Sequence, residues 1–503
     1  MSLRATLIAI NLLYIFGVQQ VFAQGVNNFW LGGYANWSGT PHGGVNLNFL
    51  SGSLDKSYII REIDFYRCNT NISDNVGERL ISSNGSFLGN AMGDTLMNGT
   101  GLSPSFYTEL YPEGLHINQA VLVLPQPGGA STYLLFHSTI DDGPNSAASF
   151  LYATTINMEG DGGLGEVVIK NEVVIEDALN PGKITAVRHA NGRDWWVFCR
   201  RTNSNIFQHL LVTPEGVTVD GTQAIGIFRP ADAGQVCFSP DGTKFAYYWG
   251  VQDLEVFDFD RCTGLFSNPV FIPIDDTNGG GGVAFSPNSR FLYVPSVADV
   301  YQFDTEAADI EASMVIVATW DGFYSPSEPF ATAFSIAQLA PDGKIYIGTG
   351  NSTFHLHVIH NPDQPGLACN LEQHGVELDR WYSNSLPNHP NYHLGPIDGS
   401  VCDSLGINVG VVPPLHRRGE GGEVGVRAHP NPSTGQFTIS YAANSEVGSL
   451  EVIDAAGRVV LQERIPQWST IHNFDISDQE HGAYTATIRW GVTKLSTYLT
   501  VLR

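Results

Sequence analysis

The residues best suited to metal chemistry are three histidines in one short run, Phe354-His355-Leu356-His357-Val358-Ile359-His360. On a strand, alternate side chains share a face, so His355 and His357 would project together and could chelate a divalent ion, while His360 would face away. No carboxylate stands at a matching spacing. The pattern therefore favours two histidines on a solvated strand face, and His355 and His357 stay as the candidate metal ligands.

Two acidic loops carry oxygen ligands of the kind that calcium prefers. Asp275-Asp276-Thr277-Asn278 precedes the glycines at 279–282, and Met158-Glu159-Gly160-Asp161-Gly162-Gly163 forms the second loop. Neither follows the ligand spacing of an EF-hand, so both patterns favour flexible acidic loops. We therefore predict no cofactor, with calcium at these loops as the alternative.

The sequence lacks the local motifs that would mark common catalytic sites. It has no G-x-S-x-G nucleophile elbow, no H-E-x-x-H zinc motif and no P-loop. Ser239-Pro240-Asp241-Gly242 approaches the Asp-box of sialidases, but its Asp and Gly are adjacent, which indicates a hairpin turn instead. No residue is predicted to be catalytic.

Aromatic residues make up 11% of the chain and could stack on sugar rings. In a protein of packed sheets, most such side chains fill the space between sheets instead. The pair Trp381-Tyr382 falls in a predicted loop, so it is the pair that we single out for ligand contact.

The elements that would position these residues are strands, because one hairpin recurs along the central region. Its three clearest copies are 237–247, 284–294 and 338–347, each with two strands around a turn such as Pro240-Asp241-Gly242. Proline presets φ, and Asp-Gly tolerates the left-handed corner of a hairpin. The copies follow one another after 47 and 54 residues. A period near 50 residues with about four strands per unit is typical of a β-propeller.

Weaker copies extend this pattern toward the N-terminus, at 185–197 and 120–137. Segments 58–67 and 77–86 can supply two more units. We therefore predict an all-β chain with a single β-propeller of about seven blades, followed by a small C-terminal β-sandwich. A row of separate sandwich modules would not explain one hairpin at a near-constant interval.

The last 76 residues show a different pattern of turns and short alternating strands. The turn cluster Pro430-Asn431-Pro432-Ser433-Thr434-Gly435 is followed by strands at 452–460, at 482–488 and at the C-terminus. This pattern predicts the small β-sandwich. In its succession of PNPSTGQF, D-x-x-G-R, G-x-Y and a last alternating strand, the tail resembles the C-terminal sorting domain of the type IX secretion system of Bacteroidota.

The resemblance implies an address for the protein rather than an activity. The residues that carry its motifs are Pro430, Asn431, Pro432, Gly435, Gly457, Gly482 and Tyr484. In that family the first four form the turn, and the two later glycines allow tight corners. The implied partner is the type IX secretion machinery. The implied route leads to the periplasm and then across the outer membrane, to the cell surface or the medium.

The N-terminus also predicts export. Arg4 precedes an apolar run at 5–18, and Val21-Phe22-Ala23 stands before Gln24 as a cleavage site. This is the pattern of a secretory signal peptide, and the run is short for a bilayer span. No other segment approaches about 20 uninterrupted apolar residues, so we predict no transmembrane segment in the mature chain. The predicted domains are a signal peptide at 1–23, a propeller at 24–410, a linker at 411–427 and the sorting domain at 428–503.

The charge of the chain limits its partners. The formal net charge is −25, and only Arg200-Arg201 and Arg417-Arg418 form basic clusters. Nucleic acid and anionic lipid need clustered Lys and Arg, so neither is a predicted partner.

Six cysteines in an exported chain permit disulfides. None forms a C-x-x-C pair, so a zinc ribbon is not expected. Cys369 and Cys402 lie in loop-rich sequence and are the pair that we expect to be bonded. Cys199 follows an apolar strand, where we expect a buried free thiol.

The whole chain allows two functional interpretations. The repeated hairpin resembles the blade of TolB-like and WD-type propellers, and the assembly is similar to uncharacterised Bacteroidota surface proteins with one propeller and a sorting tail. We expect a secreted or surface-attached propeller that binds a protein or a glycan without catalysis. The alternative is a propeller enzyme of the lactonase or glycan lyase type. Three or more carboxylates or histidines converging on the central channel would favour the enzyme.

Overall fold

The computed structural model describes residues 25–403 except 75, 275–278 and 398, and residues 427–502 except 430–432, 442–445, 455–456, 466–470 and 492. The chain divides into two compact units, Met1–Leu415 and His416–Arg503. The predicted signal peptide, with its cleavage site at Ala23 and Gln24, lies outside the described residues, and so does the predicted linker up to residue 426.

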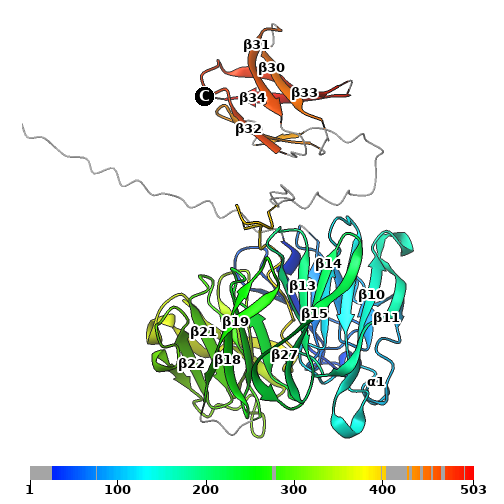
Figure 1. The fold of residues 1–503 in the computed structure, drawn as a ribbon, viewed down its shortest axis with the longest axis vertical. Helices are drawn as coiled ribbons and strands as arrows, with labels where there is room; N and C mark the ends of the chain where they lie inside the picture. The colour runs from blue at the N-terminus through cyan, green and yellow to red at the C-terminus, as the bar shows by residue number, and fades with distance from the viewer. Residues whose placement is uncertain are drawn as a thin grey trace, which may run out of the picture. The chain divides into compact units, whose positions relative to one another are not determined.

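The larger unit is a propeller-like arrangement of antiparallel sheets, each formed by consecutive strands (Figure 1). Four of its sheets have four strands in chain order. These strands are β12 (Thr185–Arg188), β13 (Trp195–Arg200), β14 (Ser204–Thr213), β15 (Gly216–Arg229); β16 (Gln235–Phe238), β17 (Lys244–Trp249), β18 (Asp253–Asp260), β19 (Leu265–Ile272); β20 (Ala284–Phe285), β21 (Phe291–Ser296), β22 (Asp299–Asp304), β23 (Val315–Thr319); and β24 (Phe334–Leu339), β25 (Ile345–Thr349), β26 (Thr353–Ile359), β27 (Leu371–Tyr382).

The N-terminal part of this unit adds a three-stranded and an eight-stranded sheet. The eight strands are two four-stranded meanders, joined where β7 and β11 run parallel at Met97 and Glu166. The strands are β1 (Phe29–Gly32), β2 (Gly44–Asn48), β3 (Asp55–Ile59); β4 (Thr70–Ser73), β5 (Arg79–Ser83), β6 (Phe87–Gly89), β7 (Thr95–Thr100); and β8 (Val121–Pro125), β9 (Thr132–His137), β10 (Ala148–Asn157), β11 (Glu166–Leu179).

The first strand of each of these sheets or meanders lies at a sheet edge. Neighbouring edge strands contact one another. In the first group β1 contacts β4 and β4 contacts β8; in the second β12 contacts β16, β16 contacts β20, and β20 contacts β24. They therefore line a central channel, as the innermost strands of a propeller do. The loops that lead into β4, β8, β12, β16, β20 and β24 form one face, here called the loop face. The hairpin turns that follow these strands form the opposite turn face.

The repeated turn closes through its own side chains, as the sequence predicts for a hairpin. Ser239 Oγ donates to Asp241 Oδ1 at 2.6 Å, and the backbone N–H of Thr243 donates to the same oxygen at 3.0 Å. Ser286 Oγ and Asn288 Oδ1 repeat the first contact at 2.6 Å in the next copy. The turns join β16 to β17 and β20 to β21.

Large apolar side chains fill the space between neighbouring sheets. Between the β12–β15 and β16–β19 sheets, the buried rings of Phe198, Phe207 and Phe266 lie with centroids 4.9–5.0 Å apart. Such burial is the main source of stability for packed sheets.

Trp30 closes the ring between the first sheet and the last. Its side chain is fully buried, and its ring centroid lies 5.0 Å from that of Phe49 and 5.9 Å from that of Tyr346 in β25. Leu47 of β2 and Leu356 of β26 belong to the same cluster. The two ends of the arrangement therefore meet through side-chain packing.

The predicted unit at 58–67 is wrong. The structure has the end of β3 and the loop before β4 in this segment. Ile63 and Phe65 are buried beside Leu31, so packing against a neighbouring sheet, and not strand pairing, causes the apolar alternation. The first sheet lies earlier, at 29–59, where no Pro-Asp-Gly turn marks it.

The smaller unit is a β-sandwich, as predicted. Its two sheets have the strand orders β28-β29-β32 and β31-β30-β33-β34. Phe437, Leu450, Ile488 and Leu499 are buried in its core. The strands are β28 (Arg427–His429), β29 (Gln436–Ser440), β30 (Gly448–Asp454), β31 (Val459–Ile465), β32 (Ile471–Asp475), β33 (Gly482–Trp490) and β34 (Thr493–Val501).

Helical structure is short, which confirms the all-β class. The α-helix of the described part is α1 (Phe106–Leu110), in a loop of the loop face. Single 3-10 turns occur at η1 (Gly25–Asn27), η2 (Asn36–Ser38), η3 (Gly143–Asn145), η4 (Asp161–Gly163), η5 (Glu311–Ser313) and η6 (Gly366–Cys369). Over the described residues, helices with the length and apolar character needed to cross a membrane are absent.

Candidate functional site

The chain returns to the central channel after β27. Residues 383–396 form neither strand nor helix, and they bond to the innermost strands. The Asn388 side chain donates to the carbonyl of Val121 in β8 at 2.8 Å and to that of Ile184, beside β12, at 2.9 Å. Its backbone N–H donates to the carbonyl of Asn69, beside β4, at 2.8 Å. The segment thereby satisfies edge-strand groups that would otherwise be unpaired.

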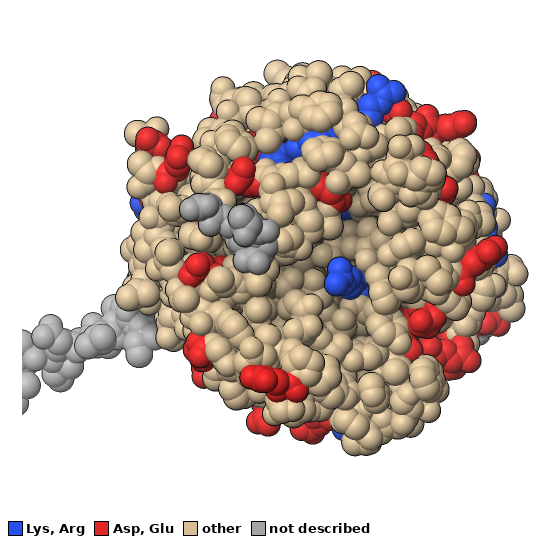
Figure 2. Space-filling view, turned by 90° about the horizontal axis from the view of Figure 1, so that it is seen from below, with Lys and Arg blue, Asp and Glu red and all other residues tan. Residues whose placement is uncertain are grey.

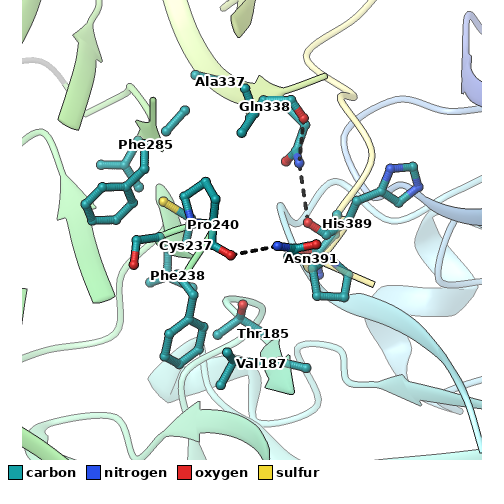
Figure 3. Close-up of a pocket in the computed structure, with 18 of the residues that line it drawn as sticks. Thr185, Val187, Cys237, Phe238, Pro240, Phe285, Ala337, Gln338, His389 and Asn391 are labelled. Atoms are coloured by element: carbon teal, nitrogen blue, oxygen red, sulfur yellow. Dashed lines mark hydrogen bonds between the residues drawn. The ribbon is translucent and has the colours of Figure 1, made fainter. Parts of the chain in front are cut away.

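A cavity of about 170 Å³ stays open beside this channel segment (Figure 3). Asn391 Nδ2 donates to the Pro240 carbonyl at 2.7 Å, and Gln338 Nε2 donates to the His389 carbonyl at 3.3 Å. The described residues that line the cavity include no Asp or Glu, and His389 is their histidine. Burial lowers the pKa of His389 to about 4, and its Nε2 donates to the carbonyl of Asn71 at 2.7 Å. This lining holds no converging set of acids and bases.

The disulfide joins Cys262 to Cys402, so the expected Cys369–Cys402 pair is wrong. Cys262 lies in the turn between β18 and β19, and Cys402 follows the channel segment, so the bond fastens the end of that segment to the turn face. The partners are 140 residues apart in the chain, which spacing alone does not reveal. Cys369 is a buried free thiol, and so is Cys199, as predicted.

His355 and His357 lie on β26, and both rings are engaged by protein groups. His357 is fully buried; its Nε2 donates to the Thr332 carbonyl at 2.8 Å, and its Nδ1 accepts from the backbone N–H of His374 at 2.9 Å. Burial lowers its pKa to about 4. His355 Nδ1 bonds to Ser325 Oγ at 2.7 Å. Both ring nitrogens of His357 are therefore occupied, and no three His, Cys, Asp or Glu among the described residues are grouped to hold a metal.

The remaining candidate ligand contacts are the Trp381-Tyr382 pair and the two acidic loops. Trp381 and Tyr382 end strand β27, so the predicted loop at this pair is wrong. Trp381 is half-buried and stacks on Phe354 at 4.4 Å, whereas Tyr382 is buried in the core. The acidic loop 275–278 lies outside the described residues, and the loop at 158–163 contains the 3-10 turn η4.

The sorting-domain residues that are described occupy turns and strand ends. Gly435 has φ +116°, and a Cβ there would lie 2.3 Å from the Ser477 Cα, so only glycine fits. Gly457 has φ +80°, Gly482 begins β33, and Tyr484 Oη donates to the Glu480 carbonyl at 2.6 Å. Pro430, Asn431 and Pro432 lie outside the described residues.

A second cavity, of about 270 Å³, opens on the loop face; we call it the Arg67 pocket. Figure 2 shows this face, with acidic side chains around the rim and a basic side chain in the central hollow. Arg67 is the cationic residue of the lining, it is exposed, and no carboxylate among the described residues pairs with it. The other lining residues that matter here are Asn118, Trp249 and Asn384. As far as the described residues go, the pocket therefore offers a positive charge without a carboxylate partner among neutral groups.

Two carboxamide oxygens of the Arg67 pocket have no hydrogen-bond partner among the described residues. Asn384 is 6% exposed and its Oδ1 is buried without a hydrogen bond, and the Oδ1 of Asn118 is likewise unpaired. A buried polar group without a partner costs about 1–3 kcal/mol, so each such group calls for an explanation. A carboxamide oxygen is a hydrogen-bond acceptor, so a bound ligand that donates to the Asn118 and Asn384 oxygens would explain why they lack protein partners.

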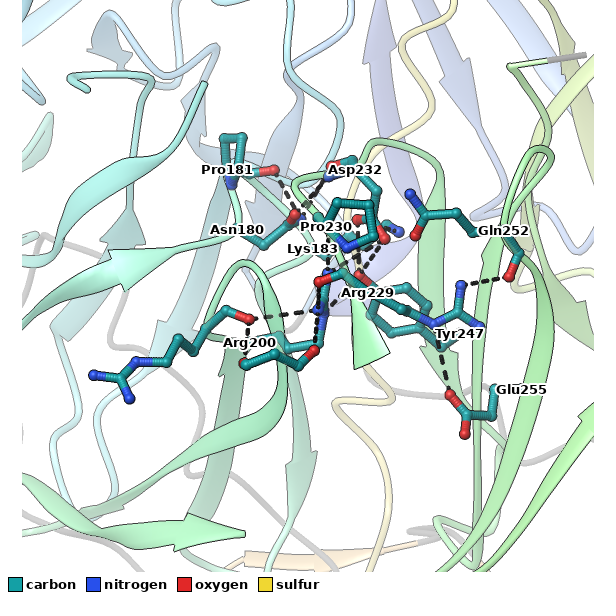
Figure 4. Close-up of polar contacts among 12 residues, drawn as sticks. Asn180, Pro181, Lys183, Arg200, Arg229, Pro230, Asp232, Tyr247, Gln252 and Glu255 are labelled. Atoms are coloured by element: carbon teal, nitrogen blue, oxygen red, sulfur yellow. Dashed lines mark hydrogen bonds and ion pairs between the residues drawn. The ribbon is translucent and has the colours of Figure 1, made fainter. Parts of the chain in front are cut away.

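The loops that lead into β12 and β16 bring together a different set of charges, which we call the Asp232 cluster (Figure 4). The Asp232 carboxylate accepts from Lys183 Nζ at 2.9 Å, from Arg200 Nη2 at 3.3 Å and from Tyr247 Oη at 2.8 Å. The remaining members are Arg229 and Glu255, whose charged groups lie 3.5 Å apart.

The Asp232 cluster is sealed from solvent. The side chains of Lys183 and Asp232 are 2% and 0% exposed, and neither residue lines the two cavities described above. Burial lowers the pKa of Lys183 to about 7, although the neighbouring Asp232 carboxylate opposes this shift. The Lys183 Nζ also lies 3.8 Å from the centroid of the Tyr247 ring. The cluster joins two sheets and offers no group to a ligand.

No sequence motif predicted the residues that line the Arg67 pocket. Arg67, Asn118 and Asn384 stand in loops without a local motif, and Trp249 ends strand β17. The one signal available is composition, since a chain with 25 Lys and Arg against 50 Asp and Glu makes an unpaired arginine unusual.

The tail matches a known family model. Residues 427–501 match the secretion system C-terminal sorting domain, so the chain ends in a domain that is recognised by secretion machinery. The comparison with curated proteins finds no match.

Three solved structures illustrate the likeness of the larger unit. A protein from Lactobacillus plantarum is 14% identical, with 72% of this chain and 99% of that chain covered and a TM-score of 0.42. A candidate 6-phosphogluconolactonase from Bacteroides fragilis is 12% identical, with 72% and 97% covered and a TM-score of 0.41. The propeller of Dos1 is 11% identical, with 66% and 74% covered and a TM-score of 0.36. Scores of this size carry no argument about activity.

Proposed function

We propose that this chain is an exported β-propeller of seven blades that binds a glycan or a protein on its loop face, without catalysis. The first sheet, the two halves of the eight-stranded sheet and the four four-stranded sheets would supply the blades. The propeller would span 24–410, with a linker at 411–427 and the sorting domain at 428–503. The Pro-Asp-Gly hairpins favour a TolB-like or WD-type blade, and the tail favours the type IX route of Bacteroidota.

The observation that carries the binding role is the contrast between the filled channel and the Arg67 pocket. Residues 383–396 occupy the channel, where a propeller enzyme would need converging acids or bases, and the lining of the remaining cavity includes no Asp or Glu among the described residues. Over the described part of the chain, the Arg67 pocket instead presents a cation without a carboxylate partner and two carboxamide oxygens without a hydrogen bond. Loops on a rigid scaffold are the usual place for recognition.

The binding role can be tested by filling the pocket. Gly350 lines it, and a Cβ at this position would meet open space, so Gly350→Trp should place an indole in the pocket without disturbing the fold. We expect the mature protein to bind a member of a glycan array or a cell-envelope protein, and Gly350→Trp to lose that binding. Gly395→Trp is the matched control, because Gly395 belongs to the channel segment, bonds to Arg261 and also has open space at its Cβ.

Two results would contradict this role. Release of product from a lactone or a glycan by the mature protein would favour the enzyme. Equal binding by the wild type and Gly350→Trp would place the ligand elsewhere.

Export can be tested separately. Deletion of residues 428–503 removes the matched domain, so we expect the truncated protein to stay in the periplasm of a host that carries the machinery. Val401→Ser, a change at a 93% exposed residue of the larger unit, should leave delivery unchanged. Cell fractionation measures both, and normal surface delivery of the truncated chain would refute the address.

A further inference from the structure

A row of half-buried rings lies next to the Arg67 pocket on the loop face. Its members touch in sequence, with centroids 4.3–6.3 Å apart. Each ring is neither fully buried nor fully exposed, so part of its surface stays accessible on the loop face. We call this set the aromatic row: Trp381, His42, Tyr34, Tyr66, His116 and Tyr111.

Trp37 extends from the same loop as Tyr34 and His42. Its side chain is 82% exposed, which is unusual for tryptophan. The turn that carries it is fixed, because the neighbouring Asn36 donates from its backbone N–H to Asp64 Oδ1 at 3.2 Å and from its side chain to the same carboxylate. A large flat ring held out into solvent by a fixed turn is suited to stacking on another flat surface.

Arg67 stands at the middle of the aromatic row. It follows Tyr66 in the chain, and its positive charge acts on both His116 and Tyr107. Burial, together with the charge of Arg67, lowers the pKa of His116, so this ring is neutral at pH 7. The row therefore lies beside the Arg67 cation.

The size of the Arg67 pocket indicates which part of a ligand it takes. Its volume of about 270 Å³ is near the lower limit of small-molecule sites, which are roughly 300–1,000 Å³. It would hold one sugar residue, whose hydroxyls and carboxylate could bond to the carboxamides of Asn118 and Asn384 and to Arg67. Further residues of the ligand would lie outside it, along the aromatic row.

The net negative charge of the protein would repel a ligand with many negative charges. The chain has a net charge of −25, and acidic side chains surround the hollow in Figure 2. A nucleic acid carries one charge per nucleotide and needs several cations, whereas a single Arg67 suits a ligand with sparse charges. A saccharide with one carboxylate among several neutral sugar residues fits both the single cation and the rings.

We propose that the loop face binds an acidic saccharide, with one sugar ring stacked on Trp37, others packed along the aromatic row, and a carboxylate paired with Arg67. The inference rests on the proposed binding role of this face and names its ligand class. A protein ligand is an outcome of the test that would refute it.

The test uses carboxylated oligosaccharides and their carboxyl-reduced forms, which keep the sugar and lose the charge. The panel is sialyl-lactose, a xylo-oligosaccharide with one glucuronic acid and a hyaluronan tetrasaccharide, titrated into the mature protein by calorimetry. We expect one acidic member to bind and its reduced form to bind roughly 10- to 100-fold more weakly, because a charge-assisted hydrogen bond is lost. Arg67→Gln should weaken the acidic ligand by the same factor and leave the reduced form unchanged.

Trp37→Ala should weaken both forms roughly two- to tenfold, since stacking does not depend on the carboxylate. Lys170→Gln and Phe228→Ala are the matched controls, because these residues are an exposed cation and a 66% exposed ring on the outer strands β11 and β15. Neither control should change binding.

The possible failures separate the two proposals. Equal binding of acidic and reduced forms, or an Arg67→Gln variant that binds like the wild type, would overturn the acidic saccharide while leaving a binding face. Binding of an envelope protein that Gly350→Trp abolishes, with no saccharide bound, would do the same. If the wild-type protein binds neither a saccharide nor an envelope protein, the binding role itself is refuted.

Discussion

The Asp232 cluster and the Arg67 pocket are both built by loops that lead into innermost strands, yet they treat charge in opposite ways. In the cluster, Lys183, Arg200 and Asp232 lie within 3.3 Å of a partner and are hidden from solvent. In the pocket, Arg67 is exposed and has no carboxylate partner among the described residues. Paired and sealed charges can only hold sheets together, whereas an open, unpaired charge is available to a ligand.

Removal of the central anion of the cluster should have the largest effect on stability. Asp232→Ala leaves Lys183 and Arg200 buried without their partner, so we expect the free energy of unfolding to fall by about 3–5 kcal/mol. Asp177→Ala is the control, because the Asp177–Arg201 pair is partly exposed and should contribute only about 0–1 kcal/mol. Denaturant titration measures both. Equal losses would show that the cluster is not a structural clamp.

The second-largest effect should be a pH dependence of the free energy of unfolding that comes from Lys183 in the Asp232 cluster. Burial lowers the pKa of Lys183 from 10.5 to about 7, so between these values the unfolded chain binds a proton that the folded chain does not. The free energy of unfolding should therefore rise with pH from 7 toward 10 through this group. Lys183→Met should remove that part of the slope. A slope that the variant keeps would mean that Asp232 holds Lys183 fully protonated.

Changes in the Arg67 pocket should have the smallest effect on stability. Arg67→Gln should alter the free energy of unfolding by no more than about 0.5 kcal/mol, because the side chain is exposed and forms no ion pair with any described residue. It should also raise the pKa of His116, since the Arg67 charge contributes to the lowering of that pKa. NMR titration of the histidine measures the shift, and Lys170→Gln should leave it unchanged. A loss of stability as large as that of Asp232→Ala would remove the contrast between the two regions.

Local sequence predicted the repeated hairpins well because their chemistry is local. Ser239, Asp241 and Gly242 close one turn among themselves, and the next copy does the same with Ser286 and Asn288. The turns of the C-terminal sandwich were predicted equally well, since Gly435 stands where only glycine fits. Such features depend on neighbours in the chain, so periodicity and turn residues suffice to find them.

Features that depend on distant partners were missed. The channel segment looks like an ordinary Pro/Asn/His loop, because Asn388 bonds to Asn69, Val121 and Ile184 far away in the sequence. Cys402 found a partner 140 residues away, not the nearer Cys369. The Arg67 pocket likewise exists only once the sheets are in place. Its location follows from topology, which a single sequence does not encode in any one segment.

The bond between Cys262 and Cys402 also decides how the molecule carries mechanical load. Along the chain, the C-terminal unit follows residue 403, so tension applied through that unit enters the larger one at Cys402. The covalent bond passes this tension directly to the turn between β18 and β19. This covalent path bypasses residues 383–396, which bond to the innermost strands.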